Sequence, residues 1–156
     1  MRDRKKRNII IDSLCCLIVF MGISYEVLSQ TLNINGTANM RSEWDIKITD
    51  ISEASTIKNL IITDGITEIG PVVFKAANIE NLRFSGTLKV IGSKAFESNK
   101  LTNTGLGKLP SSLTSLATDA FSNNPDLTQI TLTSPKDLPG WPNGGTVDGK
   151  TVTYER

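Results

Sequence analysis

The feature that most constrains the fold of this chain is an internal repeat. An apolar triplet with the spacing L-x-x-L-x-L occurs four times, beginning at Ile57, Ile79, Leu101 and Leu127. The first two intervals are 22 residues and the third is 26. The third is longer because three residues are added between Leu106 and Leu113 and one after Phe121. A fixed period with insertions confined to loops is typical of a solenoid, in which each repeat packs on its neighbours.

Each triplet ends in an alternation of apolar and polar residues, which is typical of a short β-strand. In the first copy, we expect Leu60 and Ile62 to point inward. A second phrase, I-G-x-x-x-F, recurs between the triplets and predicts the returning limb of each coil. Its phenylalanines, which we expect to stack inside, are Phe74, Phe96 and Phe121. The sequence therefore predicts a β-rich solenoid with parallel strands, made of short repeats over residues 55–135.

Residues 1–30 have the residue order of a signal peptide or a membrane anchor. Five basic residues at positions 2–7 precede a mostly apolar run from Ile9 to Ile23, and this order is typical of an export signal. We expect an N-terminal apolar helix that is either cleaved or kept in the cytoplasmic membrane through residues 9–28. Both alternatives place the chain after about residue 30 outside the cell, either secreted or at the cell surface. A buried core helix is a third alternative, although the cations before the run argue against it.

The two ends of a repeat array need caps. In the region 31–54, the alternating residues Trp44, Ile46 and Ile48 predict an N-terminal capping strand. Residues 136–156 are the predicted C-terminal cap, where Asp148-Gly149 suits a tight hairpin turn before a last strand.

The composition argues against an enzyme. The chain has no histidine, which removes the histidine-based catalytic dyads and metal sites. Its two cysteines, Cys15 and Cys16, lie in the N-terminal apolar run, so no disulfide framework or thiolate zinc site is expected elsewhere. Five of the 17 basic residues and one of the 16 acidic ones lie in the first seven positions, which leaves 12 basic and 15 acidic residues. This balance predicts no nucleic-acid partner, and no motif predicts a cofactor or a metal.

The candidate binding residues form a row along the predicted strands. The outward position before each inward pair holds an amide, at Asn59, Asn81, Asn103 and Gln129. Neighbouring strands lie about 4.8 Å apart, so the amides are expected to line up, with Arg83 in the next outward row. One interpretation is a solvated ladder in which the amides satisfy one another. The other is a recognition strip for an extracellular protein or glycan ligand, because each amide carries both donor and acceptor groups.

The repeat resembles the BspA-like leucine-rich repeats of bacterial surface proteins. The motifs DGITEIGPVVF, LKVIGSKAF and LPSSLTSLATDAF carry this resemblance, which covers about residues 50–135. Two departures are that Thr104 replaces an inward leucine and that Ala117 replaces the glycine. The asparagine that ordinary leucine-rich repeats place in the turn after each strand is also missing, so no internal asparagine ladder is expected there.

A second resemblance covers roughly the first 50 residues. The stretch YEVLSQTLNINGTANMRSEWDIKITDI, residues 25–51, resembles the N-terminal export segment of surface proteins of Gram-positive gut bacteria. Together the two resemblances imply an exported, cell-surface-associated binding module for adhesion or protein and glycan recognition. The resemblance of the N-terminal segment also implies an alternative, a structural component of an extracellular matrix or fibre.

Overall fold

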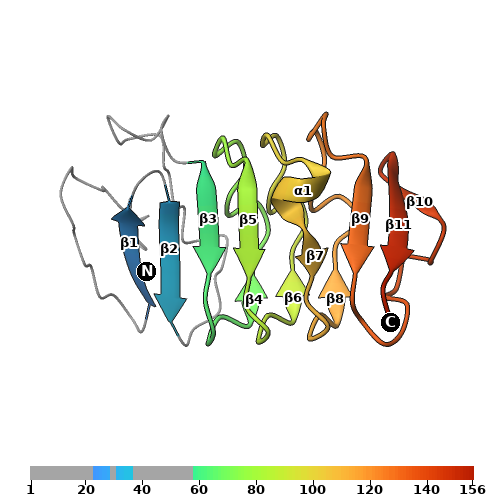
Figure 1. Ribbon diagram of the computed structural model, residues 1–156, viewed down its shortest axis with the longest axis horizontal. Helices are drawn as coiled ribbons and strands as arrows, with labels where there is room; N and C mark the ends of the chain where they lie inside the picture. Colours follow the sequence, from blue (N-terminus) through green and yellow to red (C-terminus); the bar gives the residue numbers. More distant parts are fainter. Residues whose placement is uncertain (1–22, 29–30, 37–57) are drawn as a thin grey trace, which may run out of the picture.

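The computed structural model describes residues 23–28, 31–36 and 58–156. In this part of the chain the backbone winds into a solenoid, and its coils stand side by side along the long axis of the molecule (Figure 1). A layer of longer strands forms the front, and a layer of shorter strands lies behind it. The predicted β-rich solenoid with parallel strands is therefore confirmed.

The first front sheet has the strand order β1-β2-β3-β5. Its strands are β1 (Ile23–Leu28), β2 (Thr31–Gly36), β3 (Asn59–Ile62) and β5 (Asn81–Phe84). The last three are parallel, whereas β1 pairs antiparallel with β2. The predicted alternation holds in β3, because Leu60 and Ile62 are buried while Asn59 and Ile61 are half-buried.

The N-terminal predictions fall largely outside the described residues. Within the segment 1–30, the structure describes a strand, β1, over Ile23–Leu28, and the rest of the predicted apolar helix lies outside the described ranges. The predicted capping strand around Trp44 also lies outside them. In the described ranges, β2 occupies the place next to β3. Within the same ranges, no helix has the length and apolar character needed to cross a membrane.

The second front sheet has the strand order β10-β11-β9-β7. Its strands are β7 (Lys108–Leu109), β9 (Gln129–Leu132), β10 (Thr146–Val147) and β11 (Lys150–Tyr154). The predicted hairpin turn is confirmed between β10 and β11, where Asp148 and Gly149 have φ values of 49° and 76°. A type I′ turn needs a positive φ at both central residues, which glycine and aspartate tolerate well.

The back sheet consists of three parallel two-residue strands. They are β4 (Glu68–Ile69), β6 (Val90–Ile91) and β8 (Ser115–Leu116), one from each I-G-x-x-x-F phrase or its variant. After each strand the chain turns inward and buries the phenylalanine. Phe96 stacks on Phe74 with ring centroids 5.3 Å apart and on Phe121 at 5.5 Å. The predicted inner aromatic stack is therefore confirmed.

A buried asparagine ladder closes the turn that follows each of the last two phenylalanines. The side-chain Oδ1 of Asn99 accepts hydrogen bonds from the backbone N–H of Ala77 and Ile79, and its Nδ2 donates to the carbonyls of Phe74 and Phe96. Asn124 repeats this pattern one coil later. From the sequence, we expected no asparagine ladder in the turn that follows each front strand. The ladder lies instead in the turn that follows the back strand, where the asparagine comes three residues after the phenylalanine.

The third triplet does not form the predicted strand. A short helix, α1 (Asn103–Leu106), takes its place, with Thr102 as the N-cap, whose Oγ1 accepts a hydrogen bond from Gly105 N. Thr104 is exposed here instead of pointing inward. Gly105 allows α1 to pack on β5, because a Cβ on this glycine would lie 2.1 Å from the carbonyl oxygen of Glu80. A polar residue in the inward position, followed by a glycine, makes a poor strand and favours this alternative.

The C-terminal cap covers the last coil. β11 pairs in parallel with β9, and the buried Trp141 donates from Nε1 to the carbonyl of Leu116 at the end of β8. The Tyr154 hydroxyl holds this segment by accepting from Leu138 N at 2.7 Å and donating to the carbonyl of Trp141 at 2.9 Å. Both layers of the solenoid are therefore closed at this end by hydrogen bonds.

Candidate functional site

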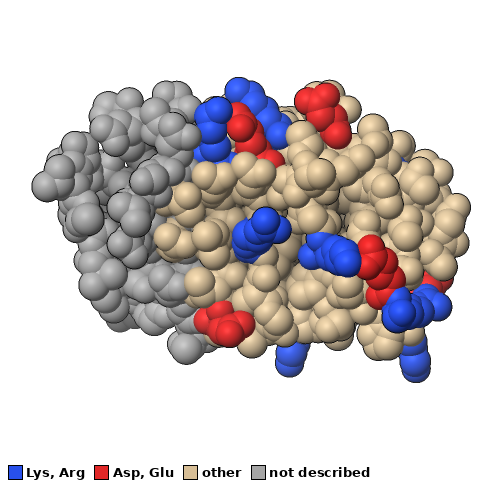
Figure 2. All heavy atoms as spheres, viewed as in Figure 1, with Lys and Arg blue, Asp and Glu red and all other residues tan. Residues whose placement is uncertain are grey.

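The candidate site is the front face, which we define as the outward side chains of β3, β5, β7, β9 and β11. The strand register arranges them in two rows. In the first row, Asn59 lies beside Asn81 on the first sheet, and Gln129 lies beside Thr151 on the second. The second row is Ile61 and Arg83, then Lys108, Thr131 and Thr153. Figure 2 shows this face as mostly uncharged, with basic side chains near its middle.

The amides of the first row on β3 and β5 bond to each other. Asn81 Nδ2 donates to Asn59 Oδ1 at 2.8 Å, and Asn59 Nδ2 donates to Thr31 Oγ1 on β2 at 3.3 Å. These bonds fix the orientation of both amides. Asn81 is exposed, and an amide carries more hydrogen-bonding groups than these bonds occupy, so the row keeps groups for a ligand.

Asn103 has a different role from the other members of the predicted row. It lies in α1, and its Oδ1 accepts hydrogen bonds from the backbone N–H of Thr128 and Gln129 at 2.9 and 3.0 Å. Its Nδ2 donates to Thr128 Oγ1. Asn103 therefore fastens α1 to the start of β9. Gln129 itself remains on the front face, where its Nε2 donates to Thr153 Oγ1 at 3.3 Å.

Arg83 is the most available charged group of the face. Its side chain is exposed, and it makes no hydrogen bond or ion pair with any described residue. The guanidinium lies beside Gly107, since a Cβ on that glycine would be 3.4 Å from Arg83 Nη1. Gly107 has a φ of 64°, a conformation that strongly favours glycine. The turn after α1 therefore leaves this side of the guanidinium without a competing side chain.

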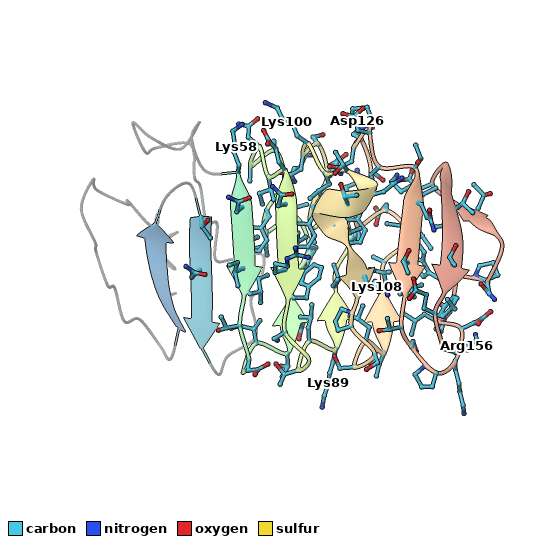
Figure 3. All side chains as sticks on the ribbon, in the orientation of Figure 1. Lys58, Lys89, Lys100, Lys108, Asp126 and Arg156 are labelled. Carbon is cyan, nitrogen blue, oxygen red and sulfur yellow. The ribbon has the colours of Figure 1, made fainter. Side chains whose placement is uncertain are left out.

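Lys108 is a residue of the face that the sequence analysis missed. From the sequence, we named only Arg83 in the second row, but β7 adds Lys108 to this row, beside Thr131. Its Nζ lies 2.5 Å from Glu155 Oε2, just after β11 (Figure 3). The alternation of exposed Lys108 with buried Leu109 was the available signal, although two residues are too short a run to predict a strand.

In the described part of the chain, no group of three histidine, cysteine, aspartate or glutamate side chains is placed to hold a metal ion. The buried Glu97 lies 2.6 Å from Lys75 Nζ and accepts a hydrogen bond from Asn123, so it links three successive coils. Asp148 bonds to Lys150 Nζ at 2.8 Å, and this hydrogen bond lowers the pKa of Asp148. Burial raises the pKa of Tyr154, whose hydroxyl is engaged in the C-terminal cap.

Comparison with known proteins identifies one family. The family model described as the BspA type leucine-rich repeat region (6 copies) matches residues 45–138. No curated protein and no solved structure matches the chain. The matched range includes all three stacked phenylalanines and both residues of the buried asparagine ladder.

Proposed function

Because the chain belongs to the BspA-type leucine-rich repeat family, we propose that it is a non-catalytic binding module whose front face carries the recognition site. Solenoids of this kind present a long side-chain surface on a rigid sheet. The observation that carries the proposal is the composition of the front face, where amides, hydroxyls and a guanidinium with no partner among the described residues lie on neighbouring strands. These groups hydrogen-bond well to a polar ligand but have no acid, base or nucleophile arrangement for chemistry.

The proposed location is outside the cell, at the cell surface or in the medium. The support is the basic and apolar order of residues 1–30, together with the family membership of the repeats. Protease added to intact cells that express the chain should therefore degrade the repeats, or the repeats should be found in the medium. A cytoplasmic marker protein should stay intact as a control. Repeats that become accessible only after lysis would contradict the proposed export.

Within that location, adhesion through a protein or glycan ligand is the role that we propose. The alternative is a structural component of an extracellular matrix or fibre, which would need an exposed strand edge for growth. At the C-terminal end, the edge strand β10 has only two residues and Pro142 precedes it. A very short edge strand opposes edge-to-edge pairing, so this end favours the binding module.

The test is an array of glycans and matrix proteins probed with the 156-residue chain and with the double variant Asn81→Ala/Arg83→Ala. The variant should lose ligand binding and keep its fold, because exposed substitutions usually change stability by only about 0.5 kcal/mol. The matched control is Lys89→Ala/Ser111→Ala, which changes an exposed cation and an exposed polar residue outside the front face. Binding that survives the front-face change and is lost in the control would place the site elsewhere.

A further inference from the structure

We propose that the front face binds an anionic polysaccharide and that Arg83 is its main anchor. This inference rests on the proposed binding function and assigns a ligand class to the same face. Its starting point is a charge asymmetry that the composition of the whole chain does not show, since 17 basic and 16 acidic residues nearly balance.

The outward positions that define the front face carry positive but no negative side chains. The outward residues of the front face are Asn59, Ile61, Asn81, Arg83, Lys108, Gln129, Thr131, Thr151 and Thr153. Two of these are cations and none is a carboxylate. Two acidic residues of the described part flank the strands instead, Glu80 before β5 and Glu155 after β11. Glu80 is paired with Lys58 at 3.1 Å. A ligand lying across the strands therefore meets cations and neutral donors.

Arg83 has the geometry of an anion anchor. Its guanidinium is exposed, is unpaired among the described residues, and faces the bare backbone of Gly107. A guanidinium presents a fork of N–H donors that matches the oxygens of a carboxylate, sulfate or phosphate group. Among the described residues, no carboxylate is paired with Arg83, so an anion that binds there displaces none of them.

A polysaccharide fits this face better than a protein does. Protein interfaces depend on buried aromatic and large side chains for most of their binding energy. Among the described residues, Val72 is the exposed large apolar side chain, and it lies in the turn after β4, outside the front strands. The face instead offers amides and threonine hydroxyls, which can donate to and accept from sugar hydroxyls.

Lys108 is a second cation that is partly occupied. Its ion pair with Glu155 is exposed on both sides, with side-chain exposures of 60% and 51%. Exposed ion pairs of this kind contribute little to stability, so Glu155 can be changed without loss of the fold. Removing the Glu155 charge frees Lys108 for the ligand, and the affinity for an anionic chain should then increase.

The experiment measures binding of the purified 156-residue chain to immobilised polygalacturonate and chondroitin sulfate, with dextran as the neutral polysaccharide and poly-glutamate as the acidic peptide. Arg83→Gln should weaken binding to the acidic polysaccharides about tenfold or more, since a lost charged hydrogen bond has this effect. Glu155→Gln should strengthen it several-fold. Lys100→Gln is the matched control, because it removes an exposed cation away from this face (Figure 3) and should change binding less than twofold.

The outcomes separate this inference from the proposed function. Binding to dextran or to an uncharged protein that depends on Asn81 and Arg83 would overturn the anionic ligand and leave the binding module standing. Preference for poly-glutamate over both acidic polysaccharides would replace the polysaccharide by an acidic peptide. Equal losses for Arg83→Gln and Lys100→Gln would show attraction by overall charge and refute Arg83 as the anchor. Failure to bind any array component through the front face would overturn the proposed function itself.

Discussion

The buried ladder residue Asn99 gives the sharpest test of how the coils are held together, through the substitution Asn99→Asp. Aspartate has nearly the same shape as asparagine, so the change creates no cavity. It replaces the Nδ2 donor, which bonds to the carbonyls of Phe74 and Phe96 at 2.8 and 2.9 Å, by an acceptor oxygen. Each buried carbonyl left without a donor costs about 1–3 kcal/mol, so the free energy of unfolding should fall by roughly 2–6 kcal/mol.

The loss should depend on pH. The new carboxyl group faces two carbonyls and is buried, and both effects raise its pKa in the folded state. A raised folded-state pKa means that the destabilisation is smallest below the unfolded pKa of about 3.9 and grows as pH rises above it. Urea unfolding of both proteins at pH 3.5, 5 and 7 measures this difference, and a variant that is unfolded at pH 7 should regain structure on acidification.

The matched control for the ladder is Asn78→Asp, an exposed residue of the preceding coil with a φ of 59°, which aspartate tolerates. It should change the free energy of unfolding by about 0.5 kcal/mol or less. A loss at Asn99 that equals the loss at Asn78, or that does not vary with pH, would refute the argument that Asn99 satisfies the turn from inside.

Three further predictions concern the core, the helix and the cap. Phe96→Ala should lower the free energy of unfolding by about 3–5 kcal/mol, roughly 1–3 kcal/mol more than Phe121→Ala does, because Phe96 contacts three aromatic rings and Phe121 contacts Phe96 alone among the described rings. Equal losses in urea unfolding would argue against a stacked core. Gly105→Ala should cost at least about 1–3 kcal/mol, since its Cβ would overlap the carbonyl oxygen of Glu80 just before β5. Gly86→Ala, with nothing within 4 Å of the added Cβ, should be nearly neutral in the same urea melts. The pKa of Asp148 is lowered in the folded state, so its carboxylate stabilises the fold at pH values above its ordinary pKa of 3.8, and this contribution is lost as pH falls. The difference in free energy of unfolding between the unchanged chain and Asp148→Asn should therefore shrink between pH 6 and pH 3, and a constant difference would contradict this.

The regular part of this fold follows from the spacing of apolar residues. The triplets and the I-G-x-x-x-F phrase predicted the coil, the inward residues of β3 and the phenylalanine stack. This was possible because each coil buries the same apolar positions, which therefore recur in the sequence at the period of the repeat. The asparagine ladder was missed for a different reason. Its signal, an asparagine three residues after Phe96 and Phe121, is present in the sequence, but asparagine is common in turns of every kind, and only the fold shows that these two side chains point inward.

The remaining error arises where the sequence departs from its own period. Thr104 indicated that the third triplet is weak, but only packing decides what replaces the strand. Gly105 has no side chain to oppose the approach of α1 to β5, and the cap at Thr102 supplies the hydrogen bond that starts the helix.

This irregular coil is also where the candidate site lies. With a regular third strand, Arg83 would have an ordinary outward neighbour on the next strand. Instead, the front layer divides into two sheets at α1, and Gly107 places only its backbone beside the Arg83 guanidinium. β7 then begins with Lys108, so a second cation follows on the far side of the break. Places where local sequence rules fail are frequently functional. If the anionic ligand binds here, restoring a regular strand with an outward side chain at this place should weaken binding even with Arg83 and Lys108 intact, because that side chain would compete with the ligand beside the guanidinium.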